Sequence, residues 1–130
     1  IRWEKEDHRE ILWEKIQEEI YKPSQPGCRS EIRILNSRPS MPLKKGTEKM
    51  FRLIHQVGLA LGQKIKREHR RGTSDANFFG AAGVPTLDGL GPICEKDHTP
   101  SEFIKVSSLK QRSCLLALFL VEYGQRIGMI

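Results

Sequence analysis

The chain has 130 residues, of which 38% are hydrophobic and 29% charged, as in an ordinary soluble domain with a core of its own. Its longest apolar run is shorter than the roughly 18 residues that a membrane span needs, and no signal peptide is visible. We therefore expect no membrane partner. The three widely spaced cysteines, without a Cys-x-x-Cys pattern, favour a reducing compartment, so we expect a cytoplasmic location. The net charge of +6 is uneven: twelve Lys and Arg face three acidic residues between Arg29 and Arg71. These charges lie on several predicted elements without a nucleic-acid-binding motif, so we expect solvated faces and no nucleic-acid partner.

A helix is predicted from Asp7 to about Tyr21. Asp7, with Glu10 three residues on, is a carboxylate variant of the capping-box pattern that starts helices. A stripe of apolar residues then recurs every four positions: Leu12, Ile16 and Ile20. The two prolines and the glycine of residues 22–27 cannot continue a helix and end it.

Two strands are predicted beside this helix, at residues 1–4 and 30–35. In the second, Ile32 and Ile34 fall on one face of an alternating pattern. One helix over two strands is too thin to be stable alone in water, so this piece needs further sheet. Residues 36–42, which contain two prolines, are predicted to form an extended crossover.

Helices and strands alternate from residue 43 onward. Three helices are predicted: one capped by Thr47 and ended by Gly62, one over residues 75–82 ended by Gly83, and a last one capped by Ser107 or Ser108. Their expected buried residues are Met50, Ile54, Val57 and Leu61 in the first, and Leu109, Leu115, Leu116, Phe119 and Val121 in the last. Strands are predicted at 63–69 and 84–87. This is the α/β pattern, in which active sites lie at strand ends and in the loops that follow.

Two such loops hold residues suited to binding or catalysis. Residues 72–77 open a helix, where free N–H groups and the hydroxyls of Thr73 and Ser74 could bind a carboxylate or oxyanion, although an ordinary helix cap has the same composition. His98 could bind zinc, with Glu102 orienting its ring, although a lone histidine in a loop is usually a surface residue. Arg38, in the crossover, could clamp a substrate carboxylate or be solvated.

Three segments, taken in their order and spacing, resemble the C-terminal part of the glutamate carboxypeptidase, acetylornithine deacetylase and aminoacylase family. They are Gly72-Thr73-Ser74-Asp75-Ala76-Asn77-Phe78-Phe79, residues 83–92 (GVPTLDGLGP) and residues 98–104 (HTPSEFI). The resemblance is strongest over residues 72–104. It implies that residues 1–40 are the second half of that family's inserted lid, or dimerisation, domain. Residues 41–130 would then be the C-terminal part of the catalytic α/β sheet domain.

The resemblance also assigns roles to individual residues. His98 matches the last metal ligand, on one of two zinc ions that share a bridging water, and Glu102 matches the acidic residue that follows it. Gly72 and Thr73 match a loop that contacts the substrate, and Arg38 matches an arginine that grips the substrate's terminal carboxylate. In such enzymes a glutamate base activates the metal-bound water, which attacks an amide carbonyl.

The chain also departs from the family pattern. No histidine is followed two places on by aspartate, so the motif of the first metal ligand is missing. The bridging aspartate and the Glu-Glu pair of the family lie upstream of these segments, and Glu18-Glu19 is predicted to be a surface pair on the polar side of its helix. Arg71 stands where relatives often have glycine, and residues 95–97 (EKD) replace a run of small residues.

We therefore expect the C-terminal fragment of a homodimeric zinc enzyme that cleaves a small N-acyl amino acid or peptide next to a free carboxylate. Residues 85–92 lean towards the glutamate carboxypeptidase branch. With one metal ligand, the 130 residues alone are expected to be inactive. Two alternatives stay open: an interaction module whose basic region binds an acidic partner, and a truncated remnant without a function of its own.

Overall fold

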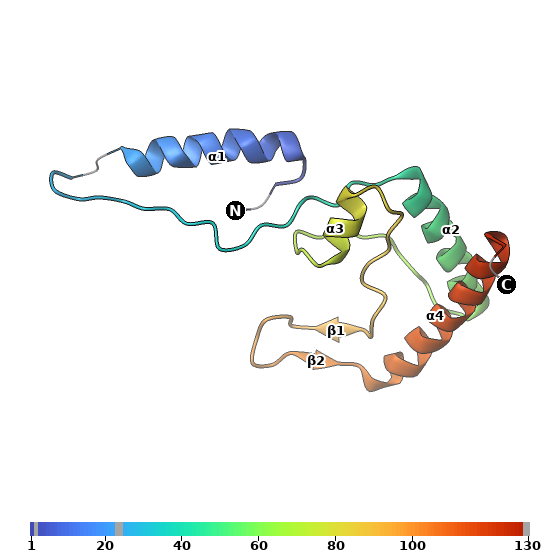
Figure 1. Ribbon diagram of the computed structural model, residues 1–130. Coiled ribbons are helices and arrows are strands. Elements are labelled where there is room, and N and C mark those ends of the chain that lie inside the picture. The colour runs from blue at the N-terminus through green and yellow to red at the C-terminus, as the bar shows by residue number, and fades with distance from the viewer. Residues whose placement is uncertain (2, 23–24, 129–130) are drawn as a thin grey trace. The chain divides into compact units, whose positions relative to one another are not determined.

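The computed structural model describes residues 1, 3–22 and 25–128. Within these residues the chain forms four helices and one two-stranded sheet (Figure 1). In chain order they are α1 (Glu6–Tyr21), α2 (Lys45–Ala60), α3 (Ala76–Ala81), β1 (Cys94–Glu95), β2 (Phe103–Ile104) and α4 (Val106–Arg126). The fold is thus mixed helical with a small sheet, which is compatible with a piece of an α/β protein. None of the helices described is long and apolar enough to cross a bilayer.

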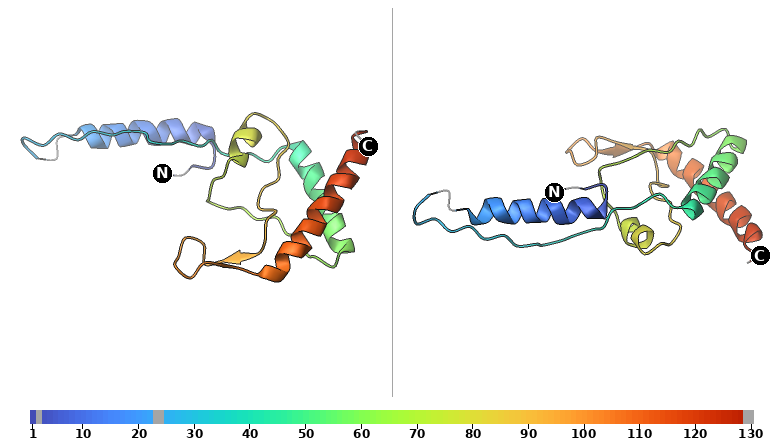
Figure 2. Two further views of the ribbon diagram at one scale, coloured as in Figure 1. Left: turned by 60° about the horizontal axis from the view of Figure 1, so that its bottom comes forward. Right: turned by 90° about the horizontal axis from the view of Figure 1, so that it is seen from above.

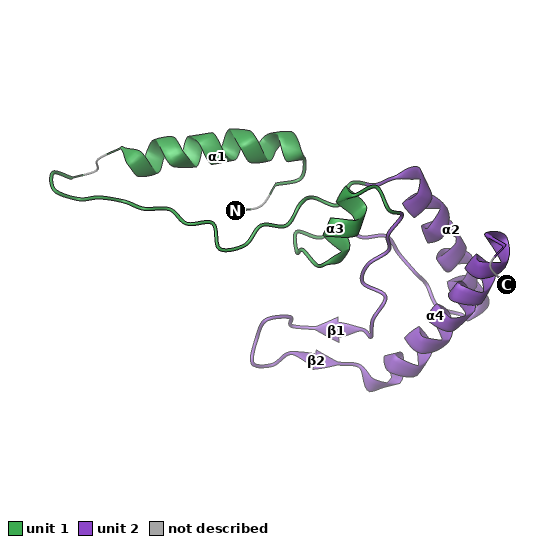
Figure 3. Ribbon diagram, viewed as in Figure 1, with its two compact units in different colours: residues 1–42, 70–84 green, residues 43–69, 85–130 purple. Residues whose placement is uncertain are grey.

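The chain divides into two compact units, neither of which is one continuous stretch (Figure 3). Unit 1 contains residues 1–42 and 70–84, and unit 2 contains residues 43–69 and 85–130. The assignment of residues 1–40 to a lid and 41–130 to a catalytic domain stays a prediction.

Helix α1 of unit 1 matches the predicted helix closely. Its stripe of Leu12, Ile16 and Ile20 is half-buried, and none of its residues is fully buried. The predicted cap was wrong, because the helix begins at Glu6, after Lys5, and Asp7 lies inside the first turn. There a carboxylate still interacts favourably with the positive end of the helix dipole. Of the residues predicted to end the helix, Pro23 and Ser24 lie outside the described ones.

The segment after α1 runs back alongside the helix (Figures 1 and 2). Glu6 fixes one point of this return, since its Oε1 accepts hydrogen bonds from the backbone N–H of Ser40 at 2.7 Å and from the indole N–H of Trp3 at 3.1 Å. The Ser40 bond is the main reason that the pKa of Glu6 lies below its ordinary value of 4.5.

The four predicted strands, two of them based on an alternating pattern, were wrong for the described residues. Residues 30–35, 63–69 and 84–87 are irregular, as are the described residues of 1–4, of which Arg2 is not described. A strand is held by hydrogen bonds to a neighbouring strand, and no described segment pairs with any of these four. Alternation alone shows which side chains share a face and cannot supply the partner.

The core of unit 2 lies where α2 and α4 pack against each other (Figure 2). Its buried residues are Leu53 and Ile54 of α2, Ile65 of the segment that follows, and Leu115 and Phe119 of α4. Met50 and Val57, which were predicted to be buried, are partly buried and pack against this core. Leu61, Leu109, Leu116 and Val121 were predicted to be buried and are exposed. A helix packed on one side buries one stripe, and Leu115 and Phe119, four residues apart, define that stripe on α4.

Two hydroxyls that were predicted to cap helices lie within the helices and accept hydrogen bonds from loop N–H groups. Helix α2 begins at Lys45 and α4 at Val106, so Thr47 and Ser108 lie inside them and Ser107 is exposed in the first turn of α4. Thr47 Oγ1 accepts from the N–H of Thr86 at 3.2 Å, and Ser108 Oγ accepts from the N–H of Ile93 at 2.9 Å. The predicted helix ends hold, since Gly62 and Gly83, with φ of +66° and +87°, each lie two residues after the last residue of α2 and α3.

A short hairpin that the sequence pattern did not predict precedes α4. Strands β1 and β2 pair antiparallel, with Cys94 opposite Ile104 and Glu95 opposite Phe103. Lys105 extends the pairing, because its N–H donates to the carbonyl of Ile93 at 2.8 Å. With two residues each, the strands are too short to show an alternating pattern. The hairpin carries the loop 96–102, which contains His98.

Candidate functional site

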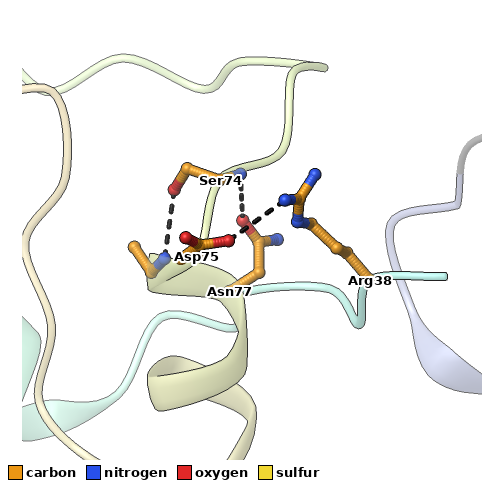
Figure 4. A network of polar contacts seen from close by, with 5 residues as sticks. Arg38, Ser74, Asp75 and Asn77 are labelled. Atoms are coloured by element: carbon orange, nitrogen blue, oxygen red, sulfur yellow. Dashed lines mark hydrogen bonds and ion pairs between the residues drawn. The ribbon is translucent and has the colours of Figure 1, made fainter. Parts of the chain in front are cut away.

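Arg38 of unit 1 is joined to the start of α3 (Figure 4). Its Nη2 donates to Oδ1 of Asp75 at 3.0 Å. The Arg38 side chain is 35% exposed, and its Nε is buried without a hydrogen-bond partner among the described residues. The predicted carboxylate clamp is therefore partly enclosed and is already paired with a carboxylate of its own chain.

The turn into α3 is closed by side chains of the turn itself. Ser74 Oγ accepts from the N–H of Ala76 at 3.2 Å, and Asn77 Oδ1 accepts from the N–H of Ser74 at 3.0 Å (Figure 4). These two amides are thus already bonded, which is the arrangement of an ordinary helix cap. Gly72 and Thr73 lie exposed just before this turn, in the same unit as Arg38.

His98 and Glu102 lie together in the hairpin loop of unit 2. Glu102 Oε2 accepts a hydrogen bond from the backbone N–H of His98 at 3.3 Å. The contact therefore fixes the backbone of His98, whereas the sequence had led us to expect Glu102 at the ring. His98 is exposed, and both it and Lys96 have a left-handed backbone, with φ of 64° and 60°. Each such non-glycine residue costs roughly 1–2 kcal/mol, so the loop is held in a strained form.

No metal site can be assembled from this chain as far as the structure describes it: no group of three His, Cys, Asp or Glu side chains is placed to hold an ion. Glu18 and Glu19 are exposed on α1, as predicted, and Glu19 pairs with Lys22 at 2.6 Å. A zinc site uses about three protein ligands, so His98 can be one ligand of a site and cannot form one.

The structure thus groups the predicted residues into two sets. Arg38, Gly72 and Thr73 belong to unit 1, and His98 and Glu102 belong to unit 2. The structure adds two residues to the first set that were not predicted. They are Asp75, which contacts Arg38, and Asn77, which donates to the carbonyl of Pro39 at 2.8 Å. Both lie within the motif of residues 72–79, but nothing in local spacing shows that a segment some 37 residues earlier is their partner.

The chain was also compared with known proteins. The sequence profile of Peptidase family M20/M25/M40 matches residues 10–122. This range includes Arg38, Gly72, Thr73, His98 and Glu102. No curated protein and no solved structure matches the chain significantly.

Proposed function

This chain belongs to Peptidase family M20/M25/M40, and from that premise we propose that it contributes residues to the active site of a zinc-dependent hydrolase. The family is one of metallopeptidases and related hydrolases whose members typically use zinc or another divalent metal. The observation that carries the proposal is the span of the match, which covers most of the chain and every candidate residue. The bond cleaved is an amide or peptide bond next to a free carboxylate.

Each candidate residue has a role in this proposal. His98 gives one imidazole ligand to a metal site whose other ligands lie outside the described residues. Glu102 holds the strained backbone of His98 through the bond to its N–H. Arg38 binds the free carboxylate of the substrate, because a guanidinium presents several N–H donors in one plane. Gly72 and Thr73 contact the substrate from the exposed turn before α3.

The proposed substrate is a small N-acyl amino acid or a peptide, with a preference for the glutamate carboxypeptidase type of reaction. The resemblance of residues 85–92 to that branch supports this preference. A homodimer is proposed for the complete enzyme on the resemblance of residues 1–40 to a lid, or dimerisation, domain. The 130 residues alone are proposed to be inactive, since they offer one metal ligand.

The proposal is tested with two preparations: the 130-residue chain, and the protein that its gene encodes. Release of free amino acid is measured from N-acetyl amino acids and from peptides ending in glutamate, with zinc and with a chelator. We expect chelator-sensitive release by the encoded protein and none by the 130-residue chain. Mass spectrometry of the purified material against the gene shows whether the chain is a natural product, a proteolytic piece or a truncated remnant.

The matched variants are His98→Ala and His69→Ala, two exposed histidines of unit 2. In His98→Ala, loss of the metal ligand should lower the activity of the encoded protein by about 100-fold or more. Loss of a group that only hydrogen-bonds to a metal ligand already costs about 10-fold to 100-fold. His69→Ala should leave the activity unchanged. Hydrolysis by the 130-residue chain itself, or full activity in His98→Ala, would contradict the proposal.

The alternative of a basic interaction module stays a prediction. Part of the basic charge is paired inside the chain: Arg33 with Glu31, Arg38 with Asp75, and both Arg52 and Arg67 with Glu48. Salt-sensitive binding of nucleic acid would support this alternative, and lack of binding at low salt would remove it.

A further inference from the structure

The guanidinium of Arg38 is oriented by a carboxylate that itself reaches into water. The Nη2–Oδ1 bond to Asp75 joins residues 37 positions apart, and the Asp75 side chain is 82% exposed (Figure 4). An exposed ion pair of this kind contributes little to stability, typically about 0–1 kcal/mol. The more important effect of this ion pair is therefore on the orientation of the Arg38 side chain.

The position of Asp75 would normally give its carboxylate another task. Asp75 directly precedes α3, where aspartate commonly accepts hydrogen bonds from the first amides of its own helix. Here it makes no such bond: Ser74 Oγ accepts from the N–H of Ala76, and the N–H groups of Asn77 and Phe78 donate to the carbonyls of Ser74 and Asp75. The cap is formed by its neighbours, which leaves the carboxylate of Asp75 for Arg38.

A second tie holds the backbone next to Arg38. Asn77 is only 8% exposed, and while its Oδ1 serves the cap, its Nδ2 donates to the carbonyl of Pro39 at 2.8 Å. A buried amide bonded on both sides is costly to displace. Met41 then lies against Gly80, where an added Cβ would come within 2.6 Å of Met41 Cγ. Residues 38–41 are thus fixed to α3 at three points.

We propose that Asp75 and Asn77 are positioning residues for Arg38 and hold its guanidinium ready for the carboxylate of a substrate. Asn77 fixes the backbone at Pro39, and Asp75 fixes the far end of the side chain. A guanidinium has five N–H donors, and the bond to Asp75 uses one of them. This inference rests on the proposed function, in which Arg38 binds the substrate's carboxylate.

A rival explanation makes the opposite prediction. If Asp75 merely occupied the place of a substrate carboxylate, its removal would free Arg38 and tighten the binding of carboxylates. If Asp75 positions Arg38, its removal weakens that binding. Asp75 is exposed, so its replacement should leave the fold of unit 1 intact and the sign of the effect can be measured.

The first experiment needs no ligand. In the 130-residue chain, the order of the Arg38 Nε–H group is measured by its ¹⁵N heteronuclear NOE in the wild type, Asp75→Ala, Asp75→Asn and Asn77→Ala. We expect the NOE to fall clearly in Asp75→Ala and to fall less in Asp75→Asn, whose amide oxygen can still accept from Nη2. An unchanged NOE in Asp75→Ala overturns the proposal.

The second experiment titrates the same chain with N-acetylglycine, followed by the chemical shift of the Arg38 Nε–H group. Asp75→Ala should bind about threefold to fivefold more weakly than the wild type. The control is Glu31→Ala, which removes the same charge from another exposed pair of unit 1, that with Arg33, and should leave the affinity unchanged. Equal or tighter binding by Asp75→Ala overturns the proposal.

Arg38→Ala separates this inference from the proposed function. Binding that survives in Arg38→Ala, or is absent in the wild type, contradicts the role of Arg38 in the proposed function. The NOE experiment then still decides whether Asp75 orders the Arg38 side chain.

Discussion

Gly58 of α2 has no room for a side chain beside Ile65. A Cβ built on Gly58 would lie 2.5 Å from Cγ1 of Ile65 and 2.9 Å from the carbonyl oxygen of Gln63. The chain turns at Gly62 and comes back against the end of the helix, where the N–H of Gln63 donates to the carbonyl of Gly58 at 2.7 Å. The absence of a Cβ at Gly58 is what lets Ile65 enter the core.

We therefore expect Gly58→Ala to destabilise unit 2. Alanine favours a helix by about 1 kcal/mol over glycine, but the clash includes a backbone oxygen that cannot turn away, and overpacking typically costs about 1–3 kcal/mol. The free energy of unfolding, measured by urea titration, should therefore fall by up to about 2 kcal/mol. The control is Gly91→Ala, because nothing lies within 4 Å of a Cβ at Gly91. Equal stability of the two variants would contradict this account of Ile65.

Ser108→Ala should loosen the attachment of the hairpin to α4. The Ser108 side chain is fully buried, and its hydroxyl accepts from the N–H of Ile93 and donates to the carbonyl of Lys105 at 2.6 Å. Its removal leaves the Ile93 donor without a partner, at a cost of about 1–3 kcal/mol. Hydrogen exchange at the Ile93 amide should accelerate at least about fivefold. Ser107→Ala, one residue earlier and exposed, should leave that rate unchanged.

The bond between Glu6 and Ser40 should weaken in acid. The pKa of Glu6 is lowered, first by the hydrogen bond from the Ser40 backbone, so the folded state favours the ionised form. The resulting stabilisation is present above the ordinary pKa of 4.5 and is lost as the pH falls through the lower pKa of the folded state. Hydrogen exchange at the Ser40 amide, corrected for its intrinsic pH dependence, should speed up below pH 4.5. Glu6→Gln should remove this pH dependence, and its persistence in that variant would assign it to another group.

Leu115→Ala should be among the most damaging changes in unit 2. Leu115 is 1% exposed and lies in the core with Ile54 and Phe119. Loss of a buried leucine side chain typically costs about 2–5 kcal/mol. Leu118→Ala, on the exposed side of the same helix, should cost less than about 1 kcal/mol. Both values follow from urea titration, and similar losses would mean that the exposed side of α4 is also packed.

The sequence predicted the helices better than any other part of the fold. The stripe from Leu12 to Ile20 and the glycines at 62 and 83 are local signals, and α1, α2 and α3 follow them within one or two residues at most ends. The strands failed because pairing depends on a partner that local alternation does not reveal. The sequence predicts a cap at Ser107 or Ser108, because local sequence does not show whether the Ser108 hydroxyl bonds the start of its own helix or the N–H of Ile93, 15 residues away.

The candidate site was predictable as a family resemblance and only partly as geometry. The profile match confirms the family suspected from residues 72–104. The roles of His98, Glu102, Arg38, Gly72 and Thr73 stay predictions. Local sequence indicated a possible carboxylate-binding site at the start of α3. It could not show that Asp75 accepts a hydrogen bond from Arg38 or that Asn77 donates one to Pro39. Those contacts arise when distant segments meet.

The interleaving of the two units has a consequence for how the protein can be made. The chain leaves unit 1 after residue 42, builds α2, and returns to unit 1 only at residue 70. During synthesis, 37 more residues must therefore be added after Arg38 before its partner Asp75 is present. Neither unit can be cut out as a single continuous piece, so a clone that stops at residue 42 contains Arg38 without the helix that holds it.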